Sequence, residues 1–347
     1  MLALLFILLV IGSDTNVFGS STWTPTLMMV FFVLMLLLHV FVHEFGHAFF
    51  GKISGYELLA VSVFGFWSLR TNNGKKRIFM PIQGAMGGTI SLPKDGYKDD
   101  TPYKLMLMGG VLMNVVLTMI CFIIVLIDIS PLVNLIMIAA ITSGLFAVIT
   151  NAVPTAMGFA VNDAMILRLF NNDGKVSKDC AYYAHMRTFA VLCGTDPDDV
   201  KVPSELPYGN RLADTVRFFS AENALMKKNY ENAEPRFTDL LNNTEDGGIV
   251  SKLTKMYLIL IQLINNADRD AVDSLYDKKM KKFVKAFAQS NHTALLLMVA
   301  YERRYAAGEN DVEKLVKRFN KIVGKLKIDT SFERDVMDTL LSDSIET

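Results

Sequence analysis

Cysteine is scarce in this chain, and its formal charges cancel. Only three of the 347 residues are cysteines, Cys121, Cys180 and Cys193, and they form no CxxC pair. This spacing excludes a disulfide framework and leaves Cys180 and Cys193 only a weak alternative as metal ligands. Lysines and arginines number 35, as do aspartates and glutamates, so no net basic charge points to nucleic acid as a partner, and we expect none.

The N-terminal part of the chain contains no lysine or arginine before Lys52. The opening stretch MLALLFILLVIGSD therefore lacks the basic region of a signal peptide, and no A-x-A site follows it. Its apolar part, residues 1–13, is shorter than the ~20 residues that span a bilayer. We interpret it as a short or tilted first helix, and the sequence leaves open whether it crosses the membrane.

Hydrophobic residues make up 51% of the chain and concentrate before about residue 170, whereas charged residues concentrate after it. Three apolar segments, 26–50, 105–127 and 132–153, are long enough to cross the hydrocarbon of a bilayer as helices. The very short turn Asp128–Pro131 makes the last two an antiparallel pair. The sequence thus predicts a mainly α protein with a polytopic membrane domain, residues 1–168, followed by a soluble α-helical domain, residues 169–347.

A β-hairpin region is predicted between the first two of these segments, over residues 55–92. Two apolar, strand-like runs flank Asn72-Asn73-Gly74, which is a hairpin signal. Glycines at 84, 87 and 88 permit close backbone approach. Two interpretations stay open: a small surface sheet, or a sheet edge beside an active site, to which an extended peptide could add as a strand.

The basic residues predict the orientation in the membrane. The loop 51–104 contains eight lysines and arginines, whereas the loops 13–25 and 128–131 contain none. The positive-inside rule then makes the loop 51–104 cytoplasmic. With four crossings both chain ends are cytoplasmic, so we expect a multi-pass protein of the cell membrane with a cytoplasmic C-terminal domain.

The C-terminal domain reads as a series of amphipathic helices. A helix, a turn at Lys228–Tyr230 and a second helix are repeated in outline near residues 295–323. The pattern is compatible with tetratricopeptide-like pairs and equally with a plain helical bundle. We expect a helical domain of this kind to bind a protein partner in the cytoplasm.

The strongest chemical signal is His43-Glu44-x-x-His47 inside an apolar helix. Residues four apart project from one helix face, so both imidazoles can reach one zinc ion. Glu44 can hold a water and take its proton as general base. Burying these groups at membrane depth is costly unless a metal pairs with them, although hydrogen bonds between helices are an alternative. His39 lies one turn earlier, either as a neighbour of the site or as a packing residue.

A third zinc ligand is expected near the end of the last apolar segment. Asn151 and Pro154 break that helix, and Asp163 follows in an otherwise apolar run. A carboxylate in apolar surroundings is stabilised when it binds a cation, so Asp163 is a candidate metal ligand. The alternative is that Asp163 caps a helix starting near Ala164.

These motifs, together with GGVLMN at Gly109–Asn114, resemble the site-2 protease family of intramembrane zinc metalloproteases. The resemblance implies that Zn²⁺ is held by His43, His47 and Asp163, with Glu44 as the general base. It implies that Asn151 steadies the substrate backbone or the developing oxyanion. It also implies a membrane-associated hairpin, which fits residues 55–92. We find the resemblance over residues 24 to about 170 and not in the helical tail.

One departure concerns the third ligand. In the family an aspartate followed by glycine comes soon after the proline, whereas here eight residues separate Pro154 from Asp163, and Ala164 follows it. An Asp-Gly pair occurs later, at Asp173–Gly174. We favour Asp163 because its neighbours are apolar, while Asp173 lies in a polar stretch.

Three functions remain after this comparison. The leading hypothesis is a zinc endopeptidase that cuts membrane-spanning or membrane-inserted polypeptides, such as regulators, signal-peptide remnants or peptide precursors, within the lipid bilayer. The second is an inactive scaffold that binds transmembrane helices and recruits partners through its tail; the intact Glu44 argues against it. The third is a metal transporter or sensor, which would need more polar residues along its helices.

Overall fold

The computed structural model of the chain describes residues 24–71, 74–80, 85–98, 100–157, 160–244, 248–289, 291–306, 309–326 and 328–342. The helix predicted at 1–13 lies outside the described residues. The chain divides into two compact units, Met1–Lys175 and Val176–Thr347. The boundary predicted at residue 168 falls inside a helix, α5 (Asp163–Cys193), which Gly174 interrupts with φ 52° and ψ −121°.

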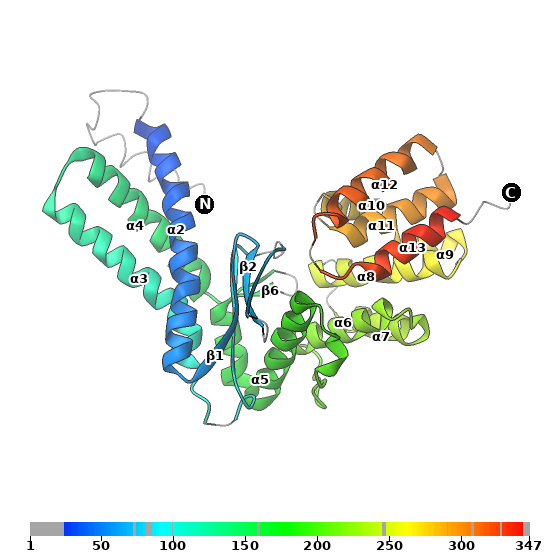
Figure 1. The fold of residues 1–347 in the computed structure, drawn as a ribbon, viewed down its shortest axis with the longest axis horizontal. Coiled ribbons are helices and arrows are strands. Elements are labelled where there is room, and N and C mark those ends of the chain that lie inside the picture. Colours follow the sequence, from blue (N-terminus) through cyan, green and yellow to red (C-terminus); the bar gives the residue numbers. More distant parts are fainter. Residues whose placement is uncertain are drawn as a thin grey trace. The chain divides into compact units, whose positions relative to one another are not determined.

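Three long apolar helices form the frame of the first unit (Figure 1). They are α2 (Thr24–Ile53), α3 (Lys104–Ile127) and α4 (Pro131–Ala152). Each is long and apolar enough to cross a membrane, which confirms the three segments predicted at 26–50, 105–127 and 132–153. The helices pack on one another in all three pairs, while many of their large apolar side chains stay exposed, as lipid-facing residues would be.

The tight turn between α3 and α4 forms as the sequence predicts. Asp128 ends α3 in a left-handed conformation, with φ 55°. Ser130 caps α4 by accepting a hydrogen bond from the backbone N–H of Val133, and Pro131 takes the first helical position. With three residues between them, the two helices run antiparallel.

Glycines let α2 and α3 approach to backbone contact. A Cβ atom on Gly46 would lie 2.3 Å from the carbonyl oxygen of Gly109, and one on Gly109 would lie 2.7 Å from that of Gly46. Small residues at helix contacts are typical of membrane proteins, where close packing replaces the hydrophobic driving force. This contact brings the HExxH turn of α2 against the N-terminal part of α3.

The region between α2 and α3 contains a four-stranded antiparallel sheet, where the sequence predicted a single hairpin. Its strands are β1 (Tyr56–Val63), β2 (Phe66–Thr71), β3 (Gly74–Phe79) and β4 (Gly87–Pro93), in the order β3-β2-β1-β4. The predicted hairpin is β2–β3, with Asn72 and Asn73 outside the described residues. The pairing of β1 with β4 joins Tyr56 to Pro93, a distant pair that turn signals do not reveal.

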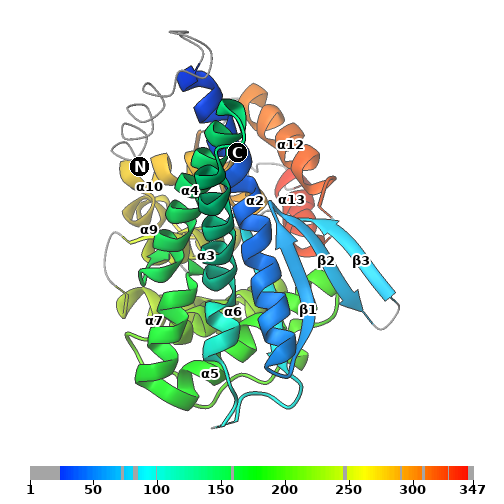
Figure 2. The ribbon, with the colours of Figure 1, turned by 90° about the vertical axis from the view of Figure 1, so that its left-hand side faces the viewer.

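The sheet packs against α2 through β1 and β4, and β3 lies farthest from the helix (Figure 2). One face of β2 and β3 buries Trp67, Leu69 and Ile78, while Phe66 and Phe79 pair across the strands on the other face. Among the described strands, β4 has a strand partner on one side only, and it also contacts α2.

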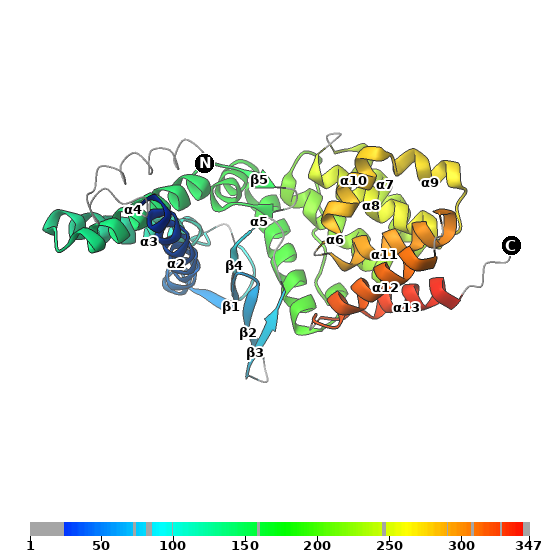
Figure 3. The same ribbon diagram turned by 90° about the horizontal axis from the view of Figure 1, so that it is seen from above.

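After α4 the chain makes a short two-stranded ladder, β5 (Ala156–Met157) with β6 (Ala160–Val161), before α5 begins. The described residues of the second unit form helices joined by loops and contain no strand (Figure 3). Beyond α5 it contains η1 (Pro197–Asp199), α6 (Arg211–Met226), α7 (Tyr230–Asn242), α8 (Ile249–Ile264), α9 (Arg269–Leu275), α10 (Lys278–Phe287), α11 (His292–Tyr301), η2 (Glu302–Ala306), α12 (Glu309–Val323) and α13 (Ser331–Ser342). The turn predicted at Lys228–Tyr230 lies between α6 and α7. The tetratricopeptide-like interpretation stays a prediction.

A buried ionic contact ties three helices of the second unit together. Arg187 of α5 donates to Glu222 of α6 across 2.6 Å, and the hydroxyl of Tyr257 of α8 donates to the same carboxylate across 2.6 Å. Arg187 also donates to the side-chain oxygen of Asn223. Because both oxygens of Glu222 are satisfied, the burial of this charge is compensated.

Candidate metal centre

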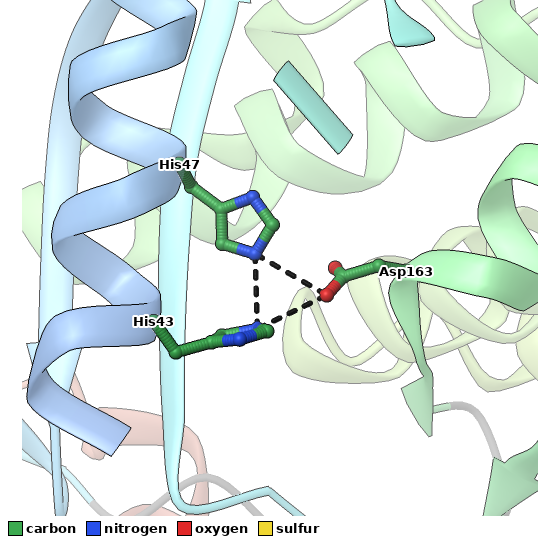
Figure 4. A group of neighbouring side chains, drawn as sticks. All are labelled: His43, His47 and Asp163. Atoms are coloured by element: carbon green, nitrogen blue, oxygen red, sulfur yellow. Dashed lines mark hydrogen bonds and ion pairs between the residues drawn. The ribbon is translucent and has the colours of Figure 1, made fainter. Parts of the chain in front are cut away.

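His43 and His47 lie one turn apart on α2 and face the same point. Their Nε2 atoms are 3.1 Å apart, and their rings meet nearly edge to face (Figure 4). Both side chains are more than nine-tenths buried, as is Glu44 between them in sequence. The 3.6-residue period of the helix thus gives the arrangement expected from the motif.

Asp163 completes the cluster from the first position of α5. Its Oδ2 atom is 3.0 Å from Nε2 of His43 and 3.3 Å from Nε2 of His47 (Figure 4). Within the described residues, these three are the one group of histidine, cysteine and acidic side chains whose ligand atoms converge, all within 4.8 Å. Cys180 and Cys193 belong to no such group.

The donor set fits a zinc ion. The Oδ2 atom of Asp163 is buried and accepts no hydrogen bond from a described residue, so a buried anionic oxygen is left for a cation. Two imidazoles and one carboxylate are ligands that zinc takes in catalytic sites, where a fourth position stays open for water or substrate. The three side chains would therefore hold zinc with one position free.

A backbone contact fixes the protonation of His47. Its Nδ1 atom lies 2.9 Å from the carbonyl oxygen of Met106 on α3. A carbonyl oxygen only accepts hydrogen bonds, so Nδ1 carries the proton and donates it. The Nε2 atom is then left with its lone pair toward the cluster, which is the state a zinc ligand requires.

The position of Asp163 depends on its neighbour Asn162, whose role the sequence did not reveal. The Asn162 amide donates to the carbonyl oxygens of Thr150 and Val153, at 2.8 and 2.6 Å, at the end of α4. Its side-chain oxygen accepts from the backbone N–H groups of Thr155 and Met165, both at 3.0 Å. Asn162 therefore caps α5 and joins it to the end of α4.

This cap corrects one alternative. The sequence allowed Asp163 to serve as the N-cap of a helix starting near Ala164. In the structure α5 starts at Asp163, and Asn162 makes the capping bond. The carboxylate of Asp163 is thereby free to face the two histidines. Asp173 lies ten residues further along α5 and is not part of the cluster.

Glu44 lies against the edge strand β4. Its Oε2 atom accepts a 2.8 Å hydrogen bond from the hydroxyl of Thr89. A Cβ atom on Gly87 would lie 2.5 Å from Oε1 of Glu44, so a side chain there would displace the carboxylate. The close approach that Gly87 was predicted to permit is thus an approach to the carboxylate. Thr89 had no signal in the sequence, because its contact depends on how β4 folds back onto α2.

Asn151 is half-buried in the last turn of α4, where its amide donates to the carbonyl oxygen of Ala147 across 2.9 Å. In the described contacts it bonds its own helix. His39 and Asn114, in contrast, are fully buried beside His43. Asn114 comes from the middle of α3, in the segment GGVLMN.

Comparison with known proteins adds the family. The sequence model of peptidase family M50 matches residues 31–328. No curated protein and no solved structure matches the chain. The match continues through most of the helical tail, so our expectation that the resemblance ends near residue 170 is wrong. With the HExxH helix, the converging aspartate and three membrane-length helices described above, the match to most of the chain shows that this protein belongs to peptidase family M50, the site-2 protease family.

Proposed function

We propose that the protein is an intramembrane zinc endopeptidase that hydrolyses peptide bonds of membrane-spanning or membrane-inserted polypeptides. The observation that carries this proposal is that the side chains of His43, His47 and Asp163 converge on one point. Glu44 lies beside them, on the same apolar, membrane-length helix as both histidines. Membership of a peptidase family supports the same reaction class.

Zinc bound by these ligands would supply a Lewis acid that polarises a peptide carbonyl and eases the deprotonation of water. Glu44 takes the proton from the attacking water and passes it to the leaving amine. Thr89 holds one oxygen of Glu44, so the other oxygen stays available for proton transfer. The helices around the site exclude bulk water, which strengthens the interactions inside it.

A helical substrate must unwind before its peptide bond can be attacked, and the edge of β4 suits the unwound segment. The edge strand contacts Glu44 through Thr89 and Gly87, so a peptide added there as a strand would pass the general base. Of the two interpretations of the sheet, we therefore favour the one in which it binds the substrate. Regulators, signal-peptide remnants and peptide precursors all remain in the proposed substrate class.

Three of the described helices are long and apolar enough to span a membrane, and we propose that the protein is a membrane protein whose helical tail is cytoplasmic. The support is the cluster of basic residues between α2 and α3, of which Arg70, Lys75, Lys76 and Arg77 lie on β2 and β3. A cytoplasmic protein partner for the tail is part of the same proposal.

The central test is Glu44→Gln, which keeps the shape of the side chain and removes the base. Membrane polypeptides cut in wild-type cells should accumulate uncut in cells with the variant, while purified variant protein retains stoichiometric zinc. The trapped polypeptide then becomes the substrate for cleavage assays. Wild-type protein that binds no zinc, or cleavage that continues unchanged in the variant, would refute the proposed function; unchanged partner recruitment without cleavage would favour the scaffold.

Two further substitutions test the remaining assignments. Asp163→Ala should lower zinc content as His43→Ala does, with Asp173→Ala as the matched control that leaves it unchanged; the reverse result would make Asp173 the ligand. Asn151→Ala should keep zinc and slow cleavage if the amide leaves the Ala147 carbonyl to steady the substrate or the oxyanion. Cleavage at the wild-type rate would remove Asn151 from the mechanism.

A further inference from the structure

His39 and Asn114 connect the candidate zinc ligand His43 to the backbone of α4. Both side chains are completely buried. The Asn114 amide lies between two imidazoles: its oxygen is 3.1 Å from Nδ1 of His39, and its nitrogen is 3.3 Å from Nδ1 of His43. The other ring nitrogen of His39, Nε2, lies 3.0 Å from the carbonyl oxygen of Ala140. The chain of contacts thus runs from α4 through α2 and α3 back to α2.

The carbonyl of Ala140 decides where the protons lie in this chain of contacts. It only accepts, so Nε2 of His39 carries a proton. If His39 is neutral, its Nδ1 has a lone pair and must accept from the Asn114 amide nitrogen. This requires the Asn114 amide to be turned by 180°, which exchanges its oxygen and nitrogen in place and brings the oxygen to His43. Nδ1 of His43 then carries a proton and donates. Nε2 of His43 is left unprotonated toward Asp163 and His47, as a zinc ligand must be.

The other orientation of the amide, with its oxygen toward His39 and its nitrogen toward His43 as the distances above have it, is costly. With its oxygen facing His39, that ring would have to donate from both nitrogens and carry a positive charge while fully buried in a membrane-spanning helix. Nδ1 of His43 would then accept a hydrogen bond from the Asn114 amide, so the hydrogen of the neutral ring would be on Nε2, where zinc should bind. Only the neutral arrangement satisfies every group and leaves the ligand atom free.

Glycines in the two neighbouring helices leave room for the imidazole rings of His43 and His39. A Cβ atom on Gly110 of α3 would lie 2.4–2.6 Å from the ring atoms of His43. One on Gly144 of α4 would lie 2.7–2.8 Å from the ring of His39. Glycine at both positions lets each imidazole lie directly against a helix backbone, which holds its ring plane.

We propose that Ala140, His39 and Asn114 form a neutral hydrogen-bond relay that fixes His43 in the Nδ1–H state and so presents Nε2 to zinc. His39 and Asn114 are positioning residues in this proposal, because they act through His43 and do not touch the metal. The inference rests on the proposed function, since it concerns the same zinc site. Water cannot replace the relay at membrane depth, so removal of one member leaves its neighbour without a partner.

The test compares two replacements of Asn114 by zinc affinity, measured in detergent by competition with a chelator. Asn114→Leu keeps the approximate volume and removes both polar atoms; it should weaken zinc binding about 10–100-fold, the usual effect of losing a partner of a ligand histidine. Asn114→Asp keeps an acceptor for Nδ1–H of His43, and a protonated His39 would balance its charge. It should bind zinc within a few-fold of wild type.

A role in packing alone predicts the opposite order, because leucine suits an apolar helix contact and a buried aspartate does not. His39→Phe removes the anchor and should weaken zinc binding about 10-fold. Thr118→Val is the control: Thr118 donates to the backbone of Asn114 one turn away on α3, and its loss should leave zinc affinity unchanged. Elution as a single species and the melting temperature of each metal-free variant show that it is folded.

The two proposals fail in different ways. If wild-type protein binds no zinc, the proposed function is wrong. If wild-type protein binds zinc and Asn114→Leu binds it equally well, or better than Asn114→Asp does, the relay is wrong and the zinc site stands.

Discussion

The hydroxyl of Thr89 on the edge strand β4 donates to Oε2 of Glu44 on the membrane helix α2, across 2.8 Å. This one bond connects the sheet to the proposed general base. The same hydroxyl lies 3.3 Å from the backbone oxygen of Glu44, so Thr89 contacts both the side chain and the backbone of this turn of the helix. The strand that would bind substrate is therefore in direct contact with the base that would act on it.

Thr89→Val should slow cleavage without removing zinc. Valine keeps the shape of threonine and removes the donor, and a hydrogen bond to a charged group contributes about 1.5–3 kcal/mol. If that bond orients Glu44 in the transition state, the rate should fall about 10–100-fold. The measurement is cleavage of the polypeptide trapped by Glu44→Gln, with zinc content determined in the same samples.

Thr89→Ser provides the matched control, because serine retains the hydroxyl. It should cleave at close to the wild-type rate. Equal rates for the valine variant and the wild type would mean that the bond does not orient Glu44. Loss of zinc from the valine variant would mean that Thr89 supports the fold of the site and not the base.

Asn162→Ala should weaken zinc binding through Asp163. The substitution removes four hydrogen bonds that join the end of α4 to the start of α5. The carboxylate then loses its fixed position, and zinc affinity should fall about 10–100-fold, as it does when other supports of a metal ligand are removed. Chelator competition on the purified protein measures this change.

The control for Asn162 is Asn134→Ala, which also removes an asparagine associated with α4. Asn134 donates to Asp128 in the turn before that helix, at its opposite end. Its loss should leave zinc affinity at the wild-type value. If both variants bind zinc equally tightly, Asp163 is held by α5 itself and not by the Asn162 cap.

The sequence predicts those features that depend on residues near one another in the chain. The membrane helices follow from long apolar runs without charge, and the HExxH face follows from the period of one helix. The choice of Asp163 over Asp173 rested on apolar neighbours, and the structure brings Asp163 to both histidines. These inferences need only local pattern and the cost of burying charge.

The missed features depend on contacts between distant segments. Thr89 is 45 residues from Glu44, and the pairing of β1 with β4 closes a comparable loop, so neither contact leaves a periodic signal. Asn162 was visible beside Asp163, but its four bonds reach two helix ends whose relative position only the folded chain defines. Asn114 stood in the GGVLMN segment, yet its link to His39 requires α2, α3 and α4 together.

Gly46→Ala should destabilise the membrane bundle, whereas Gly51→Ala on the same helix should not. A Cβ atom on Gly46 meets the backbone of Gly109 at 2.3 Å, and backbone cannot move aside without separating α2 from α3. On Gly51 the nearest atom is the Cγ of Met106 at 3.3 Å, in a flexible side chain. Overpacking of this kind costs about 1–3 kcal/mol, while alanine favours a helix by about 1 kcal/mol over glycine.

The measurement for this pair is the apparent melting temperature in detergent, with zinc content as a second readout. The Gly46 variant should melt at a lower temperature and bind less zinc, because His43 and His47 flank the displaced turn. The Gly51 variant should melt at or above the wild-type temperature. Equal melting of the two variants would show that α2 and α3 can separate at Gly46 without cost.

Alkylation of Cys180 should report the stability of the helical second unit. The thiol is completely buried in α5, and burial, with a smaller contribution from Asp179, raises its pKa to about 12. Between pH 7 and 9 an ordinary thiol reacts faster as it ionises, whereas Cys180 should stay protonated and unreactive toward iodoacetamide until the unit unfolds. Half-buried Cys193 on the same helix serves as the internal comparison.

The Cys180 thiol should make the second unit less stable as the pH rises. The folded-state pKa of Cys180 lies above the unfolded value of about 8.5, so the unfolded chain loses its proton first as the pH rises. The contribution of this thiol to stability is therefore complete below about pH 8.5 and decreases above it. Protection of Cys180 should decline at high pH in wild-type protein, and Cys180→Ser should remove that dependence from the melting curve of the unit.

Glu222→Gln should destabilise the second unit, and the alkylation of Cys180 measures the effect. It removes the charge that Arg187 and Tyr257 both contact, so the buried guanidinium is left without its counter-ion. Breaking a buried pair from one side costs about 3–5 kcal/mol, and the alkylation of Cys180 at pH 7 should accelerate at least about 100-fold. Zinc content should not change, since every proposed ligand lies in the first unit. A rate equal to that of wild type would show that this ionic contact does not hold α5, α6 and α8 together.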